Sequence, residues 1–203
     1  MADQIFPTKG NLMAAKKSLE FSKMGYDLMD RKRNILIREM MLLIDKTKAL
    51  REEIDQTFHK AYLALQTANI SLGSIDEVAD AVPVETGVTL TYRSVMGAEI
   101  PQVRLRENPE KLYYSLYRTN STLDEAFLCF EKVKKLTVVL AEVENSTFRL
   151  ANAIRKTQRR ANALKNIIIP NFEVTVKFIT EALEEKEREE FSRLKVIKAK
   201  ANR

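Results

Sequence analysis

The first third of the chain carries apolar residues spaced alternately three and four positions apart. Read as heptads, seven of nine a positions and six of eight d positions are apolar, with no Pro between the first and the last. These positions, called the seam, predict one long helix that packs along a partner as in a coiled coil. The a positions are Leu12, Leu19, Tyr26, Arg33, Met40, Thr47, Ile54, Ala61 and Ala68. The d positions are Ala15, Ser22, Met29, Leu36, Leu43, Leu50, Thr57 and Ala64.

A different periodicity follows, where Gly and Pro interrupt the helical pattern. Residues 88–95 (VTLTYRSV) and 100–106 (IPQVRLR) are rich in β-branched side chains and alternate apolar with polar positions. The short link between them predicts a β-hairpin over about 88–106. Pro101 cannot donate a ladder hydrogen bond, which places its strand at an edge. A two-stranded hairpin on its own is only marginally stable in water, so we expect it to pack against the helices or against another subunit.

A second helical pattern is expected to begin near Pro109 and Glu110, since Pro is tolerated in a first helical turn. Its first apolar stripe consists of Leu112, Leu116, Leu123, Phe127, Phe130, Leu136, Leu140 and Val143. Beyond Pro170 the stripe shifts frame and continues through Phe172, Val176, Ile179 and Leu183. Because a Pro inside a helix removes one hydrogen bond, we expect a kink and a local change of supercoil at this point.

Two long helices joined by a compact insert predict an all-α dominated fold. We expect a long antiparallel, left-handed coiled-coil hairpin of two helices, with a small insert that contains the β-hairpin. The expected organisation is an N-terminal helix over residues 1–70, an insert over 71–109 and a C-terminal helix over 110–203.

Composition narrows the function classes. Of 203 residues, 31% are charged and only five are Gly, which is typical of long helices. The only cysteine is Cys129 and the only histidine is His59, and no Gly-rich phosphate loop is present, so we expect no enzyme activity, no cofactor and no metal. No signal peptide and no apolar run of membrane-spanning length is evident, so we expect a cytoplasmic chain without membrane insertion.

The net charge of +6 permits nucleic acid, anionic lipid or an acidic protein as partner. Between Ser146 and Phe172 there is no Asp or Glu, yet there are six bases. The apolar stripe here runs through Thr147, Leu150, Ile154, Thr157, Ala161, Leu164 and Ile168. A helix that excludes acids over this length indicates adaptation to an enclosing surface. We name as the basic collar Arg149, Arg155, Gln158, Arg159, Arg160, Asn162 and Lys165.

Several segments together resemble a known family. They are FRLANAIRKTQRRANAL at 148–164 followed by Ile169-Pro170, Pro7-Thr8-Lys9, and EREEFSRLK at 187–195. These segments resemble the D subunit of V-type and A-type rotary ATPases, and the likeness covers nearly the whole chain, weakest over 73–108.

The resemblance implies a central rotor shaft, one copy per complex, whose coiled coil enters the ring of catalytic A and non-catalytic B subunits. It implies binding to the F subunit and to the membrane-side subunit that caps the proteolipid ring. The complex lies on the cytoplasmic side of the membrane as a peripheral assembly. The sequence leaves open whether the complex synthesises or hydrolyses ATP, and which ion it couples.

For the basic collar we expect contact with the A/B ring through interactions that exchange as the shaft turns. The alternatives are a solvated basic face and an electrostatic site for RNA, which would make the chain a rigid coiled-coil arm. A scaffold coiled coil is a third reading, although such proteins commonly dimerise through parallel helices. No nucleic acid is expected as a partner, since aromatic residues do not interleave with the bases.

A second surface has more apolar bulk than a two-stranded seam needs. It is called the aromatic patch and consists of Tyr62, Leu65, Phe127, Phe130 and Val133. We expect it to seat the F subunit. The alternative is that it packs the insert onto the helices.

Overall fold

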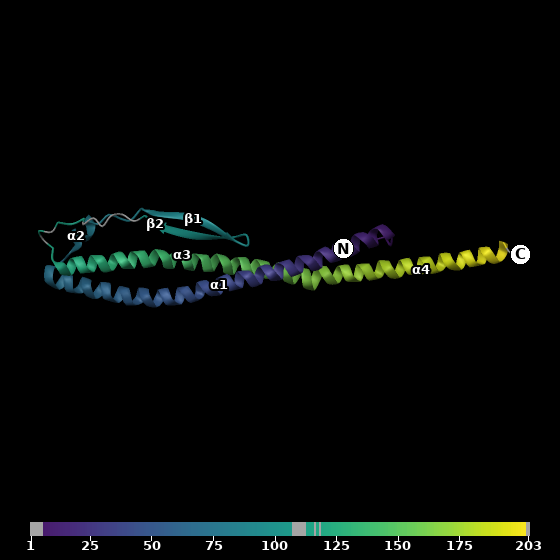
Figure 1. Cartoon of the computed structure of the whole chain (residues 1–203), viewed down its shortest axis with the longest axis horizontal. Helices are drawn as coiled ribbons and strands as arrows, with labels where there is room; N and C mark the ends of the chain where they lie inside the picture. The colour runs from purple at the N-terminus through teal and green to yellow at the C-terminus, as the bar shows by residue number, and fades with distance from the viewer. Residues whose placement is uncertain (1–5, 107–112, 116, 118, 202–203) are drawn as a thin grey trace. The chain divides into compact units, whose positions relative to one another are not determined.

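Long helices dominate the structure, a computed structural model that describes residues 6–106, 113–115, 117 and 119–201. Its elements in chain order are α1 (Lys9–Leu72), α2 (Asp76–Ala81), β1 (Val88–Val95), β2 (Ala98–Leu105), α3 (Ser121–Ala163), the π-helical turn η2 (Leu164–Ile168) and α4 (Ile169–Ala201) (Figure 1). The chain forms two compact units. The terminal unit comprises Met1–Asn34 with Arg155–Arg203, and the middle unit comprises Ile35–Ile154.

The heptad reading of α1 is confirmed position by position. Each of the predicted a and d residues is buried or half-buried, and none is exposed. Small side chains at Ala61 and Ala68 are fully buried, which indicates close approach of the partner helix at this end of the middle unit. Packing of this one stripe, rather than helix propensity, supplies most of the stability of such a helix.

Contacts between the helices follow an antiparallel order in each unit. In the terminal unit, Lys9 near the start of α1 pairs with Glu187 at 3.1 Å, and Lys23 pairs with Glu173 at 2.8 Å. In the middle unit, contacts run in the same sense from Arg51 with Glu144 to Ser71 with Thr122. The predicted class, an antiparallel helical hairpin with a small two-stranded insert, is confirmed.

The start of α3 differs from the expectation that the second long helix begins near residue 109. Pro109, Glu110, Leu112 and Leu116 lie outside the described residues, and α3 begins only at Ser121. Its first turn is capped by the preceding residue, Asn120, whose side-chain oxygen accepts the backbone N–H of Leu123 at 3.2 Å. An Asn cap satisfies a helical N–H that would otherwise have no partner, which a Pro in the first turn cannot do.

The insert contains the expected β-hairpin. β1 and β2 pair antiparallel from Val88 with Leu105 to Val95 with Ala98, joined by the two residues Met96 and Gly97. Both turn residues have positive φ, 50° and 75°, as a type I′ turn requires. The turn therefore matches the right-handed twist of the strands and fixes their register.

The hairpin packs on the long helices within the middle unit. Ala98 and Ile100 of β2 are buried in one cluster with Leu36 of α1 and Leu150 of α3, both of which are fully buried. The expectation that the hairpin packs against the helices is thereby confirmed.

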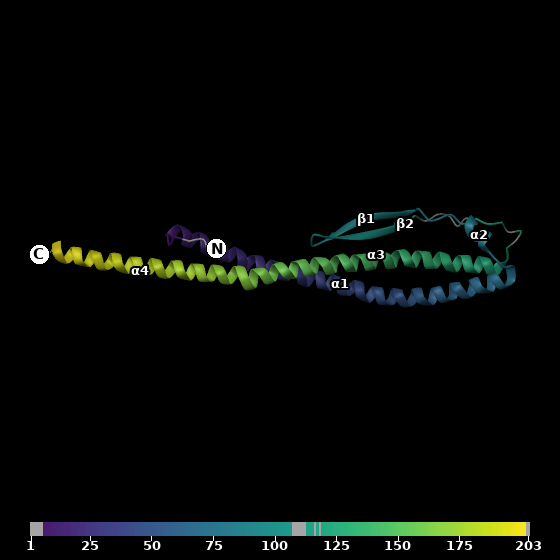
Figure 2. The same ribbon diagram turned by 180° about the vertical axis from the view of Figure 1, so that it is seen from behind.

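The outward edge of β2 is held by a row of side chains from α3. Glu142 accepts the N–H of Val103 at 2.8 Å, and Ser146 donates to the carbonyl of Pro101 at 3.3 Å. Figures 1 and 2 show β2 between β1 and α3. The helix therefore satisfies backbone groups that an edge strand would otherwise leave unpaired.

The frame shift near Pro170 takes the form of a π-helical turn. The N–H of Ile169 bonds to the carbonyl of Leu164, five residues back, immediately before the Pro. A π-helical turn adds one residue to a helix, which accounts for the consecutive four-residue steps of the stripe. Beyond it the stripe recovers, with Ile179 fully buried.

Replacing Leu36 by Ala tests the role of the hairpin cluster. Leu36 is 0% exposed, so we expect Leu36→Ala to lower the free energy of unfolding by about 2–5 kcal/mol. The matched control is Leu42→Ala on the same helix, since Leu42 is 60% exposed and should cost about 0.5 kcal/mol or less. Urea unfolding followed by circular dichroism measures both. Equal effects of the two substitutions would contradict the packing described.

Candidate functional site

The basic collar presents its cations to solvent while its apolar stripe is buried. Leu150, Thr157 and Ala161 are at most 5% exposed, as the seam predicts. All the predicted collar bases are exposed. Arg149 belongs to the middle unit, and the other collar residues belong to the terminal unit.

Two collar bases lie against aromatic rings. Lys165 lies 5.8 Å from the ring centre of Tyr26, and Arg149 lies 5.4 Å from that of Tyr92. Cation–π contacts of this kind contribute on the order of 0.5–1 kcal/mol at exposed sites. These two cations are therefore partly held in place by their own chain.

The remaining collar bases project without an ionic partner. Among the described residues, no ion pair or hydrogen bond restrains the side chains of Arg155, Arg159 and Arg160. Lys156 is exposed in the same way, although the prediction left it out of the collar. The absence of acids within reach in sequence explains why no helical i,i+4 pair forms here.

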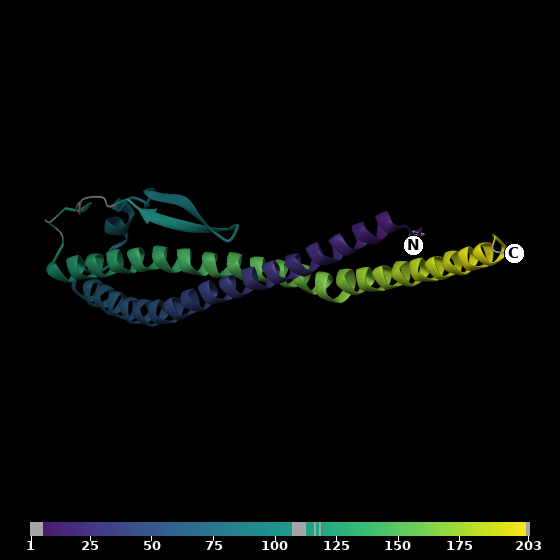
Figure 3. The same ribbon diagram turned by 45° about the vertical axis from the view of Figure 1, so that its right-hand side comes forward.

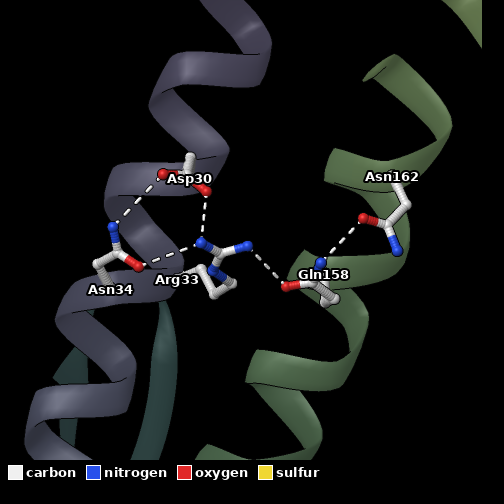
Figure 4. A network of polar contacts seen from close by, with 5 residues as sticks. All are labelled: Asp30, Arg33, Asn34, Gln158 and Asn162. Carbon is white, nitrogen blue, oxygen red and sulfur yellow. Dashed lines mark hydrogen bonds and ion pairs between the residues drawn. The ribbon is translucent and has the colours of Figure 1, made fainter. Parts of the chain in front are cut away.

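The predicted collar residues Gln158 and Asn162 also take part in a polar network with Arg33 of α1, called the polar layer (Figure 4). Arg33, at an a position of α1, donates to the side-chain oxygen of Gln158 at 2.9 Å and pairs with Asp30 at 2.6 Å. Gln158 in turn donates to Asn162 at 2.8 Å. The heptad pattern identifies Arg33 as a polar a residue but does not reveal its partner on the other helix.

The polar layer fixes how the two helices align in the terminal unit. Arg33 donates to Asp30 and Asn34 on its own helix and to Gln158 on the other helix, and its Nε is buried without a hydrogen-bond partner. A polar residue at one a position specifies register at a cost in stability. We infer the same role for Arg33, with Asp30 offsetting its charge.

An exposed apolar stripe on α1 was not predicted from the sequence. The exposed fractions are 72% for Met13, 58% for Phe21, 46% for Met24 and 65% for Leu28. These residues occupy b, c and f positions, which a two-stranded coiled coil leaves to solvent. The apolar residues at these b, c and f positions are the sequence signal from which the stripe could have been predicted. The stripe lies in the terminal unit, like most of the basic collar.

The aromatic patch lies in the middle unit and is partly covered. Tyr62 is 54% exposed and meets Phe130 edge to face at 5.8 Å. Val133 is only 5% exposed, so it supports the patch from beneath. Leu65, Phe127 and Phe130 line a pocket of about 330 Å³. The patch therefore has both an open part and a covered part.

The cover of this pocket comes from the insert. Val78 and Ala79 of α2 and the following Val82 and Pro83 form the opposite wall. Figure 3 shows α2, the short teal helix, on the same side of α3 as the hairpin. The alternative considered for the aromatic patch, that it packs the insert onto the helices, thus describes part of its surface. The exposed ring of Tyr62 remains available to a partner.

Charged groups at the rim of the pocket attach the insert to α3. The pKa of Glu85 is held below its usual value by the N–H of Gly87, which donates at 2.9 Å, and by Lys134 at 3.1 Å. Burial works against the charge of Lys134, but hydrogen bonds to Glu131 and Glu85 outweigh it and raise its pKa. Lys134 therefore stays protonated and bridges both carboxylates.

Tyr114 completes this rim. Burial and a 2.7 Å hydrogen bond donated to Asp124 raise its pKa to about 12. Its ring meets Phe127 edge to face at 5.8 Å. Tyr114 thus remains neutral at physiological pH and acts as a packing residue with one satisfied hydroxyl.

Within the described part of the chain, no cluster of His, Cys, Asp and Glu could hold a metal ion. None of the described helices is long and apolar enough to cross a membrane.

A paired-helix chain with a docked hairpin and a basic collar defines a stalk-type helical subunit, and comparison with known proteins identifies its family. The family model for the ATP synthase D subunit matches residues 11–199. The chain is 43% identical to the V-type ATP synthase D subunit of Thermotoga neapolitana, over 98% of this chain and 99% of that relative. It is 37% identical to the A-type ATP synthase D subunit of Pyrococcus horikoshii, over 97% and 94% respectively.

The chain belongs to the ATP synthase D subunit family. Members of this family are stalk subunits of the complex and are not themselves catalytic. The resemblance stated from the sequence is confirmed.

The ion pairs of Glu85 predict a pH dependence. A carboxyl whose pKa is lowered by folding contributes stability above its unfolded pKa, near 4.5, and loses it as the pH falls through the lower folded pKa. Between about pH 6 and about pH 3 the wild-type chain should therefore lose more stability than Glu85→Gln does. Urea unfolding of both across this range measures the difference. Parallel curves would contradict the pairing.

The polar layer makes a separate prediction. Arg33→Ala removes the partner of Gln158 and should lower the free energy of unfolding by about 1–3 kcal/mol. The control is Arg31→Ala, since Arg31 is exposed on the same helix and should change stability by about 0.5 kcal/mol or less. Thermal unfolding of the full chain measures both. A loss for Arg31 as large as that for Arg33 would refute the assignment.

Proposed function

We propose that this chain is the central-stalk rotor shaft of a V/A-type rotary ATPase. In this role it couples ATP hydrolysis or synthesis in the ring of A and B subunits to rotation of the membrane ion-translocating ring. The single observation that carries the proposal is the acid-free helical surface of the basic collar, on a chain of the ATP synthase D subunit family.

A shaft must transmit torque without unwinding. Two paired helices resist bending and twisting better than one, and the seam is buried or half-buried at every predicted position of α1. The polar layer favours one register of the two helices, because a slip would remove the hydrogen bond between Arg33 and Gln158.

A shaft must also turn inside its bearing without locking. Arg155, Arg159 and Arg160 have no partner in the described part of the chain, so they are free to form contacts with a surrounding sleeve. Long cationic side chains can exchange between acidic and carbonyl groups with little change in energy, since exposed ion pairs contribute only about 0–1 kcal/mol each. We propose that the whole collar, including Arg149 and Lys165, lies in this contact zone.

The exposed apolar stripe extends the proposed bearing surface. Met13, Phe21, Met24 and Leu28 lie on α1 in the same unit as most of the collar. Flexible Met and Leu side chains adapt to changing neighbours, which suits a contact that slides. We propose that this stripe meets apolar parts of the same sleeve.

The F subunit is the partner we propose for the aromatic patch. The exposed ring of Tyr62 and the half-buried Leu65, Phe127 and Phe130 offer an apolar contact surface, and the buried Val133 supports it. Large aromatic side chains dominate the energetics of protein interfaces, which favours this surface as the contact. We also propose the membrane-side subunit that caps the proteolipid ring as a partner.

Reversing the charge of the collar tests the rotor assignment. The variant Arg155→Glu, Arg159→Glu and Arg160→Glu should weaken assembly with purified A and B subunits by at least about tenfold, a change of about 1.4 kcal/mol. The ATPase rate and the torque of the complexes that do form should fall as well, because like charges then face the sleeve.

The matched control reverses three exposed bases outside the collar, Lys46, Lys48 and Lys60. It carries the same change in net charge and should assemble normally. Unchanged assembly, ATPase rate and torque in the collar variant would refute the proposal, as would an equal loss in the control.

A further inference from the structure

The two edges of the hairpin have different surroundings: the β2 edge faces α3, and the β1 edge does not. The N–H of Val103 and the carbonyl of Pro101 point outward to α3, so alternate residues of β2 direct their backbone groups to that edge. In an antiparallel pair, the residues opposite them direct theirs to the far edge. By the register these are Val88, Leu90, Tyr92 and Ser94 of β1.

The far edge is open. Seven of the eight residues of β1 are exposed and the eighth is half-buried. Beyond the pairing of β1 with β2, the N–H and carbonyl groups of Leu90, Tyr92 and Ser94 make no hydrogen bond with any other described residue. An open edge of this length is a template for another strand.

Apart from the charge of Arg93, the sequence of β1 carries no feature that blocks this edge. β2 carries Pro101 at an outward position, and α3 covers the same side. β1 (VTLTYRSV) has no Pro, no Gly and no Lys, and its regular register leaves no bulge. Natural proteins protect exposed edges by such devices. Their presence on one strand and absence on the other indicates that the β1 edge is used.

The side chains beside the edge define the chemistry of its occupant. Val88, Leu90 and Tyr92 form an exposed apolar row on one face, at 46%, 59% and 58% exposure. The other face carries Thr89, Thr91 and Arg93. Between Gly87 and Arg106 the hairpin has three Arg and one Glu, and none of these Arg side chains has an ion pair among the described residues.

We infer that the β1 edge binds an extended segment of another protein by strand addition, a segment that alternates apolar and acidic side chains. The apolar side chains cover Val88, Leu90 and Tyr92, and the acidic ones face the row of Thr89, Thr91 and Arg93. Main-chain hydrogen bonds supply affinity and the alternating rows supply specificity, as in other strand-addition complexes.

A second copy of this chain fits the edge poorly. Pairing β1 with β1 would bring together two copies of the same row that contains Arg93, without an acid to offset either cation. Each chain also carries a net charge of +6, which opposes association.

The test uses the full chain alone and a synthetic ten-residue peptide of alternating Val and Glu, capped at both ends and labelled with fluorescein. Because no other subunit is present, its outcome is independent of the proposed rotor function. We expect saturable binding by fluorescence anisotropy. The same peptide, N-methylated at its six central amides, keeps its charge but loses the donors and should bind at least tenfold more weakly.

A pair of chain variants separates edge pairing from apolar contact. Leu90→Pro removes one outward N–H without touching the pairing to β2, and should weaken peptide binding at least tenfold. Leu90→Thr removes apolar area but keeps the donor, and should weaken binding less than Leu90→Pro does. Amide hydrogen exchange read by NMR supplies a measurement on the wild-type chain, where bound peptide should slow exchange at Leu90, Tyr92 and Ser94.

Three results would overturn the inference: no saturable binding, equal binding of the N-methylated peptide, or unchanged exchange at those three amides. Self-association of the chain that Leu90→Pro abolishes, measured by sedimentation, would also overturn it and would identify a second copy as the occupant.

Discussion

The burial of one narrow stripe between two antiparallel helices is the constraint on which the rest of this structure depends. The large side chains that are fully buried, Leu36, Leu150 and Ile179, all lie on that stripe. With no globular core, each helix keeps most of its circumference exposed, and the surface is free to vary for function. The hairpin and α2 are held on the helix pair by packing, through Ile100 in one place and the pocket walls in another, and by polar contacts with α3 such as that of Val103 with Glu142.

Surface chemistry follows from that constraint. Most of the acid-free collar lies in the terminal unit, on α3 and η2, and the exposed apolar stripe lies on α1 of the same unit. In the middle unit the surface is instead occupied by the insert and by the aromatic patch. Under the proposed function, one helix pair would carry two kinds of contact, an exchangeable one at the collar and a fixed one at the aromatic patch, because the seam does not restrict the residues at the outer positions. Catalysis belongs to other subunits, as expected of a family whose stalk subunit is not catalytic.

Periodicity predicted much of the fold, since a heptad pattern reports directly on burial. The hairpin was also predictable, because Met96-Gly97 lies between two alternating segments. The start of α3 was not, since Asn120 and Pro109 both offer local signals and only tertiary packing decides between them. The partner of Arg33 could not be predicted either, because its contact with Gln158 depends on the register between segments far apart in sequence. For the candidate site, the sequence identified the cations but not which are held by rings, as Lys165 is by Tyr26.

The helix pair, the collar and the family membership are the observations that support the proposed rotor shaft. Reconstitution of the purified A and B subunits with this chain, followed by native mass spectrometry and an ATPase assay, tests this role directly. We predict one copy of the chain for each ring of alternating A and B subunits, with a turnover rate that differs from that of the ring alone. No association with the ring, together with retention of the chain on RNA at physiological salt, would contradict it.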